Sequence, residues 1–261
     1  LSWLEEVRRE TGLLLAVEVA SPEHVKIISN YRVDMIWLGA RTISNPFSVQ
    51  EIANQIEGKN IPVLVKNPMN PDIDLWIGAL ERLYRAGVRR LAAVHRGFYP
   101  YKASSYRNPP CWEIPIELKR QFPELPVICD PSHIAGKRDL IAEVTQKAID
   151  LNLEGLMIES HVNPSLALSD PHQQVTPTQL GDLLNGLQKR KPDSENQQFK
   201  NNLETLRGKI DELDNRMLEI LAERMKMVKE IGQYKKDNQV TILQLKRWQK
   251  ILVSRLDKGK E

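Results

Sequence analysis

Polar and charged side chains recur in the first two thirds of the chain, each at the end of a short apolar run. Arg41 follows MIWLGA, Lys66 closes VLVK, and Arg96 follows LAAVH. His133 lies in CDPSH after PVIC, and Glu159 ends LMIE. Side chains at the carboxyl ends of parallel strands meet at one mouth of a (β/α)-barrel, which is where that fold performs its chemistry. Two arginines, a lysine and a His/Glu pair at such a mouth predict an anionic, phosphorylated substrate beside a divalent metal.

Three of the candidate residues form a possible metal-binding set. His133, Glu159 and Asp170 offer one nitrogen and two carboxylates, which suits Mn²⁺, Fe²⁺ or Zn²⁺ better than Ca²⁺. The alternative is a structural histidine and carboxylate pair, which is the commoner role of such residues. Asp130, just upstream of the histidine, has three open roles: it orients His133, contacts the substrate, or caps the turn that follows.

The cations form a second set. Arg41, Lys66 and Arg96 lie on three neighbouring predicted strands, and together they match a phosphate and a carboxylate carried on one small molecule. The alternative is three ordinary surface cations. Cys129 points to the opposite side of its strand from Asp130, so we expect it to pack in the core. The segment 97–112 is long enough to be a lid, and a rigid surface loop is the alternative.

The elements that position these residues are short strands alternating with helical patterns, which predicts an α/β fold with a parallel sheet. The expected strands are 13–19, 35–40, 62–66, 91–95, 126–130 and 155–159. The expected helices are 22–29, 49–57, 73–86, 113–121, 140–151 and 178–187. A closed (β/α)8 TIM barrel needs eight strands, so either this sheet is open or two strand-helix units precede Leu1. Because the polar groups sit at strand ends as in a barrel, we favour the second explanation.

Composition changes after this region. Residues 188–198 contain no apolar side chain and predict a linker, which divides the chain into a barrel domain (1–187), a linker (188–199) and a helical domain (200–261). The helical domain carries an apolar stripe that predicts one long amphipathic helix: Leu203, Leu206, Ile210, Leu213, Met217, Ile220, Val228 and Ile231. A turn near 236–239 precedes a second helix at about 242–256. Two such helices must dimerise, pack on the barrel, or pack on further helices beyond Glu261.

Three cations on the long helix stand out from its stripe. Arg224 and Lys235 are eleven residues apart, close to three whole turns, so they project from one face. Arg207 lies about 100° around from Arg224, so it serves a different surface or a partner chain's site. Arg224 interrupts the apolar stripe, and a cation there is costly unless an anion meets it. The alternative is a coiled-coil seam with solvated charges.

Bulk properties exclude some classes of function. The net charge is +3, from 37 basic and 34 acidic residues, and the basic residues are not grouped on one face, so no nucleic-acid partner is expected. No apolar run reaches the roughly 18 residues that a membrane span needs. Two cysteines give no disulfide framework, which fits a reducing cytoplasm.

Five motifs, in order along residues 1–187, resemble the 3-deoxy-D-arabino-heptulosonate-7-phosphate (DAHP) synthases that are related to 3-deoxy-octulosonate-8-phosphate synthase. They are GAR (39–41), PVLVKNPMN (62–70), HRG (95–97), CDPSHIAGKRDL (129–140) and ESHVNPSLALSD (159–170). By this resemblance Arg41, Lys66 and Arg96 are phosphoenolpyruvate ligands. We also expect Asp130 to bind the substrate and Lys66 to be catalytic. His133, Glu159 and Asp170 match three of four metal ligands. The family's fourth ligand, a cysteine on the first strand, and its Lys-Pro-Arg-Thr motif on the second have no counterpart in this chain.

The resemblance implies condensation of phosphoenolpyruvate with erythrose 4-phosphate and release of phosphate, the entry step of the shikimate pathway. Its cofactor is a divalent metal, Mn²⁺ in the first place, with Fe²⁺, Zn²⁺ or Co²⁺ as alternatives. The related octulosonate synthase is the competing enzyme, and it differs in the sugar that it accepts.

A second resemblance covers the C-terminal helices. LETLRGKIDELDNRMLEILAERMKMVKEIGQYKK (203–236) is similar to the first helix of the all-helical chorismate mutases. Their Arg, Arg and Lys fall on Arg207, Arg224 and Lys235, the last two catalytic, while Gln244 and Arg247 match substrate-binding positions of the second helix. This family commonly has Asp where Gln244 stands and Glu where Trp248 stands, and it has a third helix. Its members form intertwined dimers in which one Arg crosses to the partner's site.

Together the two resemblances predict a bifunctional cytoplasmic enzyme of aromatic amino acid biosynthesis. It makes DAHP, converts chorismate to prephenate, and forms a homodimer or higher homo-oligomer through the helical domain. The alternative of another class is a regulatory helical domain that only binds chorismate or prephenate. We also expect that the 261 residues are part of a longer polypeptide and cannot perform the synthase reaction alone.

Overall fold

The computed structural model describes residues 2–191 and 193–259. The chain forms two compact units that divide between Arg190 and Lys191. The first contains all strands of the described residues, and the second consists of helix. Among the described residues, no helix combines the length and the apolar character that crossing a membrane requires.

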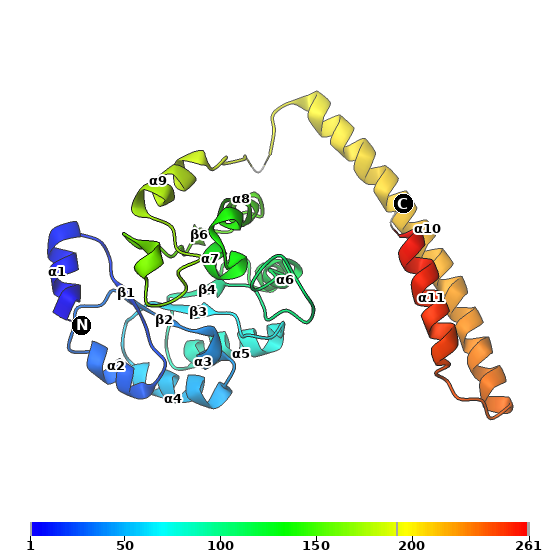
Figure 1. Cartoon of the computed structure of the whole chain (residues 1–261), viewed down its shortest axis with the longest axis horizontal. Coiled ribbons are helices and arrows are strands. Elements are labelled where there is room, and N and C mark those ends of the chain that lie inside the picture. Colours follow the sequence, from blue (N-terminus) through cyan, green and yellow to red (C-terminus); the bar gives the residue numbers. More distant parts are fainter. Residues whose placement is uncertain (1, 192, 260–261) are drawn as a thin grey trace. The chain divides into compact units, whose positions relative to one another are not determined.

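The described part of the first unit contains one six-stranded parallel sheet in which each strand pairs with the next along the chain. The strands are β1 (Ala16–Glu18), β2 (Met35–Leu38), β3 (Val63–Lys66), β4 (Leu91–His95), β5 (Val127–Cys129) and β6 (Gly155–Leu156). All six lie within the predicted ranges, and the sheet is a curled part of a barrel (Figure 1). β6 is shorter than predicted, although the chain beyond it still bonds to its neighbours through the Met157 N–H and the Glu159 carbonyl.

Helices form an arc around the outer face of the curled sheet (Figure 1). They are α2 (Pro22–Ile28), α4 (Pro46–Ile56), α5 (Ile73–Arg85), α6 (Glu113–Gln121) and α8 (Ile141–Asp150), followed by α9 (Pro177–Gly186). Local signals start them. Asn45 accepts a hydrogen bond from the Phe47 N–H, with Pro46 at the first helical position, so α4 begins three residues before the predicted Val49.

The strands alternate between two environments, as their pleat requires. Ile36, Val63 and Val65 are fully buried in the core that the sheet shares with the helices. Trp37 and Leu64 are only half-buried. Cys129 is fully buried in the core, which confirms its predicted packing role.

Several short helices were not predicted from the sequence: α1 (Ser2–Thr11), α3 (Ala40–Ile43), α7 (Pro131–Ala135), and the 3₁₀ turns η1 (Arg138–Leu140) and η2 (Pro164–Leu166). α3 and α7 begin where β2 and β5 end, and they carry Arg41 and His133. Apart from α1, these segments have three to five residues and are too short to show helical periodicity. α3 and α7 turn the chain at the same edge of the sheet where the candidate residues gather.

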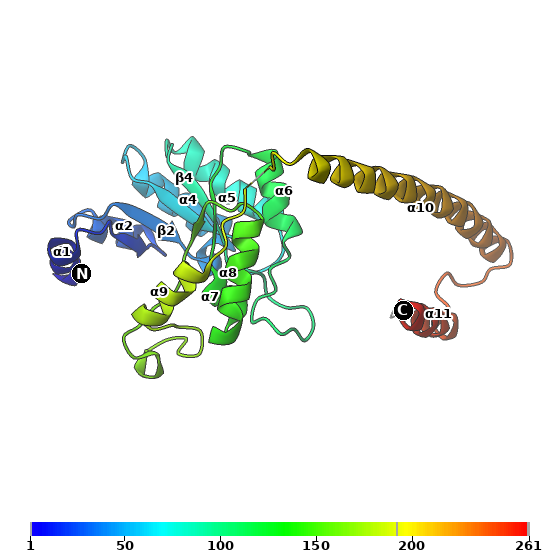
Figure 2. The ribbon, with the colours of Figure 1, turned by 90° about the horizontal axis from the view of Figure 1, so that it is seen from above.

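The second unit has a long helix, α10 (Gln197–Asp237), and a shorter one, α11 (Leu245–Lys258). Figure 2 shows α10 as one continuous helix. Asn196 caps it by accepting from the Phe199 N–H, so residues 197–199 of the predicted linker are helical. Neither helix buries any of its described residues. The predicted apolar stripe is therefore present, and all of it except the half-buried Leu203 is exposed within this unit.

Candidate active site

Lys66 lies at the carboxyl end of β3 and is almost completely buried. Its Nζ donates to Oδ2 of Asp130 over 2.7 Å and lies 4.5 Å from the centroid of the Trp37 ring. A buried ammonium needs such partners, because water no longer solvates it. The Trp37 ring and the Asp130 carboxylate therefore hold a desolvated positive charge at the strand end.

Asp130 directly follows β5 and joins this lysine to His133. Its Oδ1 accepts from the His133 backbone N–H (3.1 Å) and lies 3.0 Å from the His133 Nδ1. Burial alone would raise the pKa of Asp130, but the hydrogen bond from His133 and the charges of His133 and Lys66 outweigh it and lower the pKa to about 2. Asp130 is therefore ionised, caps α7 and orients His133. Capping and orienting are two of the three roles that the sequence allows for it.

His133, Glu159 and Asp170 come together, each contributing a ligand atom to a group whose members lie within 4.8 Å of one another. The His133 Nε2 lies 3.9 Å from Oε1 of Glu159. The Nδ1 contact with Asp130 leaves Nε2 as the free nitrogen, which is how metal-binding histidines are usually held. One imidazole and two carboxylates at this spacing fit a divalent transition metal.

Arg96 follows β4 and is 6% exposed. Its guanidinium donates to Oδ1 of Asn108 over 2.8 Å. Burial lowers the pKa of Arg96 more than nearby Asp130 raises it, and the charges of Arg107 and Arg41 lower it further. The cations thus gather in one place. Arg41, at the start of α3, is exposed and free to meet a ligand from solution.

Four further residues of the site were not predicted: Asn67, Arg107, Asn108 and Gln173. Asn67 directly follows Lys66, is fully buried, accepts from the Arg96 N–H and donates to the Gly97 carbonyl. Its position after a strand was a usable signal, because the neighbouring lysine was singled out for the same reason. Arg107, Asn108 and Gln173 lie in loops, where nothing in the sequence distinguishes them.

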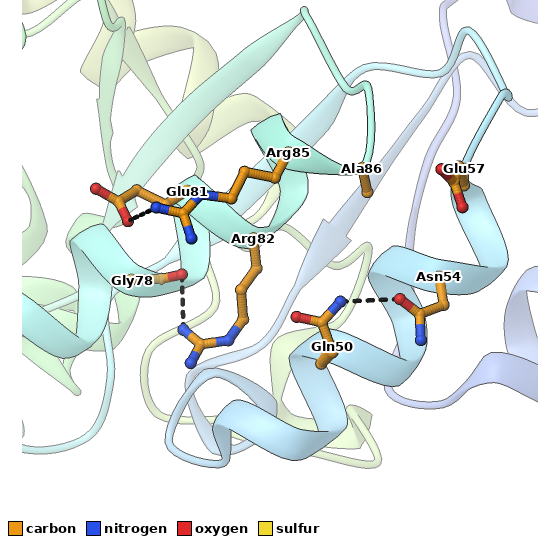
Figure 3. A pocket seen from close by; sticks show the side chains of 8 residues that line it. All are labelled: Gln50, Asn54, Glu57, Gly78, Glu81, Arg82, Arg85 and Ala86. Atoms are coloured by element: carbon orange, nitrogen blue, oxygen red, sulfur yellow. Dashed lines mark hydrogen bonds and ion pairs between the residues drawn. The ribbon is translucent and has the colours of Figure 1, made fainter.

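A polar hollow of about 430 Å³ lies between α4 and α5, away from these residues (Figure 3). It is lined by Gln50, Asn54, Glu57, Gly78, Glu81, Arg82, Arg85 and Ala86. Glu57 and Ala86 follow the carboxyl ends of their helices, which run back toward the opposite end of a barrel. Glu81 neutralises Arg85, and the Gly78 carbonyl accepts from Arg82 (Figure 3). The hollow therefore lacks the convergent free groups of the strand-end site.

Four of the five predicted mutase residues are exposed on the second unit, and Lys235 is half-buried. Lys235 donates to the Ile242 carbonyl over 2.7 Å, and Gln244 stands at the start of α11. Arg207 pairs with Glu204 at 3.4 Å. Among the described residues, no contact joins Arg224 to Lys235 or to Arg247, so these groups do not form a closed pocket within one chain.

The curled parallel sheet, with cations and a metal-compatible cluster at its strand ends, defines the class of protein: a (β/α)-barrel fold whose chemistry lies at the carboxyl mouth. Residues 1–195 match the model of the DAHP synthetase I family, and the chain belongs to this family. Residues 206–261 match the chorismate mutase type II model.

Known relatives agree with this placement. A phospho-2-dehydro-3-deoxyheptonate aldolase from Thermotoga maritima is 26% identical over 175 residues, which are 67% of this chain and 50% of that protein. The chain thus spans about half the length of this curated relative. The crystal structure of that enzyme type from T. maritima matches 70% of this chain and 52% of its own, at 25% identity and a TM-score of 0.63. A truncated form from the same organism matches 70% of this chain and 68% of its own, also at a TM-score of 0.63.

Proposed function

We propose that the α/β unit serves the condensation of phosphoenolpyruvate, erythrose 4-phosphate and water to DAHP and phosphate. The observation that carries this proposal is the continuous contact from Lys66 through Asp130 to His133. It links an anion-binding cation to the metal-compatible cluster across two strand ends. The octulosonate synthase is the alternative, and the chorismate mutase match at residues 206–261 favours the aromatic pathway instead.

The cations would hold the phosphoenolpyruvate. Lys66 uses one N–H for Asp130 and keeps two for the substrate. Arg96 and Arg41 offer planar guanidinium groups that match phosphate and carboxylate oxygens. Fixing the anion in a desolvated site supplies orientation, and it strengthens each charge-assisted hydrogen bond.

His133, Glu159 and Asp170 would hold the divalent metal, for which Mn²⁺ is our first choice and Fe²⁺, Zn²⁺ and Co²⁺ are alternatives. When bound, the ion supplies Lewis acidity that polarises the aldehyde oxygen of the sugar phosphate. Asp130 keeps the His133 Nε2 turned toward the two carboxylates.

This proposal is tested by metal removal. In the intact polypeptide, we expect chelation to abolish DAHP formation and Mn²⁺ to restore it. His133→Ala should lower activity at least about 100-fold, because losing a residue that only orients a metal ligand already costs 10- to 100-fold. His172→Ala is the matched control, since His172 is exposed and lies outside the ligand cluster. Full activity in the chelated wild-type protein would remove the metal from the mechanism.

We further propose that the helical unit converts chorismate to prephenate. The rearrangement is pericyclic and needs no acid, base or nucleophile, so cations that hold two carboxylates and stabilise the developing ether-oxygen charge are sufficient. The similarity of residues 206–261 to chorismate mutase type II supports this role for Arg224 and Lys235, with Arg207, Gln244 and Arg247 around the substrate. The second candidate is a sensor that binds chorismate or prephenate without turnover.

Arg224→Ala tests the mutase proposal. Losing one charge-assisted contact to the transition state should cost roughly 2–4 kcal/mol, or about two to three decades in turnover. Arg216→Ala is the control, because Arg216 is an exposed arginine of the same helix on a bearing about 80° away. Near-normal turnover in Arg224→Ala would favour the alternative that the helix is a coiled-coil seam with solvated charges. Binding of chorismate without turnover in the wild type would favour the sensor.

A further inference from the structure

The loop between β4 and α6 returns to the site and is fastened there by its backbone. The Asn108 N–H donates to the Ile134 carbonyl (3.1 Å), and the Arg107 N–H donates to the Ala135 carbonyl (3.3 Å). Both acceptors belong to α7, the helix that carries His133. Residues 107 and 108 therefore hold a fixed place beside the candidate metal ligands.

Asn108 connects this place to the anion-binding side. Its side chain is buried, its Oδ1 accepts from the Arg96 guanidinium (2.8 Å), and its Nδ2 donates to the His133 carbonyl (2.7 Å). An amide is suited to this position because it offers an acceptor and a donor on one rigid group. Asn108 thus fixes how the Arg96 guanidinium faces the mouth of the sheet.

Arg107 connects the same place to the carboxylates. One of its terminal nitrogens donates to Oδ1 of Asp170 (2.6 Å) and to Oε1 of Gln173 (2.7 Å). Gln173 is 1% exposed, and its Nε2 donates to Oε2 of Glu159 (2.6 Å). One guanidinium therefore fixes one oxygen of each carboxylate, directly or through Gln173. The other oxygen of Glu159, Oε1, is the one that faces His133.

Gly136 makes room for this arrangement. It ends α7 in the left-handed conformation (φ 68°), and a Cβ placed on it would overlap with the Arg107 side chain. The absence of a side chain at Gly136 therefore leaves the space that the Arg107 side chain occupies beside α7.

We propose that Arg107 and Asn108 are positioning residues. From one loop, they orient the anion-binding and the metal-binding side chains of the site. Asn108 orients Arg96 for the substrate anion. Arg107 orients Asp170 directly, and Glu159 through Gln173, for the divalent ion. This inference rests on the proposed synthase function and adds residues that act through the ligands rather than on the substrate.

Two effects of Arg107 on metal binding oppose each other. Its positive charge repels a cation, whereas its hydrogen bonds hold the carboxylates in the binding geometry. The Asp170 carboxylate already neutralises the guanidinium at 2.6 Å, so we expect the orienting effect to dominate. Loss of such outer contacts typically costs 10- to 100-fold in metal affinity.

The experiment measures two dissociation constants by titration calorimetry on the metal-depleted 261-residue chain: one for Mn²⁺ alone and one for phosphoenolpyruvate alone. We expect Arg107→Ala to weaken Mn²⁺ binding about 10- to 100-fold with little change for phosphoenolpyruvate. Arg107→Lys should recover part of the loss, because an ammonium lacks the planar fork of Arg. Asn108→Ala should show the reverse pattern, weakening phosphoenolpyruvate binding about 10-fold or more and sparing Mn²⁺.

Lys102→Ala, an exposed cation of the same loop, is the control and should change neither constant. If Arg107→Ala does not fold, Gln173→Met breaks the branch to Glu159 with a side chain of similar size, and it should weaken Mn²⁺ binding alone. Unchanged or tighter Mn²⁺ binding in Arg107→Ala or Gln173→Met, or equal losses of both ligands in every variant, would overturn the assignment. A wild-type chain that binds no divalent ion would instead refute the proposed metal-dependent function and the Arg107 role, while the phosphoenolpyruvate titrations would still test Asn108.

Discussion

His95 shows that a residue inside a functional motif can serve packing. It belongs to the HRG motif, yet its ring is fully buried beside Trp76, Phe98 and Trp112, with centroid distances of 6.5, 5.7 and 5.2 Å. Among the described residues, neither ring nitrogen has a hydrogen bond of normal geometry. Burial lowers the pKa of His95 to about 3, outweighing Asp130 and the nearby Pro110 carbonyl, which raise it. The folded protein therefore keeps this imidazole neutral.

This burial predicts a pH dependence of stability. The unfolded chain takes up a proton at His95 below about pH 6.5 and the folded chain does not until about pH 3, so stability falls as pH drops through this window. Between pH 7 and pH 5 the wild type should lose about 2 kcal/mol more than His95→Leu, which cannot titrate at this position. Urea unfolding at both pH values measures the difference. Equal losses in the two proteins would mean that His95 is solvated or paired.

At the scale of single residues, the sequence predicted which charged or ionisable side chains lie at the strand ends. Lys66, Arg96 and His133 were found because each follows an apolar run. Arg107 and Gln173 were not, because their partners lie 63, 66 and 14 residues away in the chain and only the fold brings them together. Periodicity reports a residue's own environment and not which distant side chain it will meet.

The sequence of the loop 97–112 allows either a lid or a rigid surface loop, and hydrogen bonds make the base of this loop rigid. The Phe98 N–H donates to the Pro109 carbonyl (2.9 Å), which closes the loop at its neck. Gly97 has φ 75°, and a Cβ on it would overlap with the Asn108 carbonyl oxygen. The tip, residues 101–105, is exposed. The loop is therefore held by a hydrogen bond at its neck, and its tip is exposed.

Replacing the neck glycine should disturb the site. Gly97→Ala adds about 1–2 kcal/mol for a left-handed non-glycine residue and also pushes Asn108 away from Arg96. We expect lower stability in urea unfolding and weaker phosphoenolpyruvate binding. Gly58→Ala is a matched control, because Gly58 also has positive φ (73°) but has nothing within 4 Å of its added Cβ. Similar behaviour of the two variants would show that the neck adapts without cost.

For whole elements the sequence was a good guide wherever a pattern is long enough. Each expected strand contains an observed one, since apolar runs bounded by turn signals leave few alternatives. The start of α4 was missed because an Asn-Pro cap, and not the first apolar residue, begins the helix. β2 ends at Leu38, two residues before the predicted end at residue 40, because Gly39 is the N-cap of α3 and turns the chain out of the strand.

At the scale of the whole molecule, the described residues of the second unit leave an apolar surface that they do not cover themselves. Leu206, Ile210, Leu213, Met217 and Ile220 are 55–62% exposed on α10 and recur at alternating steps of four and three residues. Such a stripe on a helix is stable in water only when another surface covers it. A second copy of the chain would supply an identical stripe, and the homodimer or higher homo-oligomer predicted from the mutase resemblance would cover both.

The oligomer proposal makes the final prediction, which links assembly to activity. We expect a solution mass of at least twice 30.0 kDa by light scattering at micromolar concentration, and a fall toward one chain on dilution. Leu213→Glu places a carboxylate in the apolar seam, which costs several kcal/mol and should weaken association about 100-fold or more. Lys226→Glu, an exposed change of charge about 140° around the same helix from Leu213, should leave the mass unchanged. Because Arg207 is expected to reach the partner's site, mutase turnover should fall with the oligomer. A single-chain mass in the wild type, or full turnover in a monomeric Leu213→Glu variant, would contradict this link between assembly and catalysis.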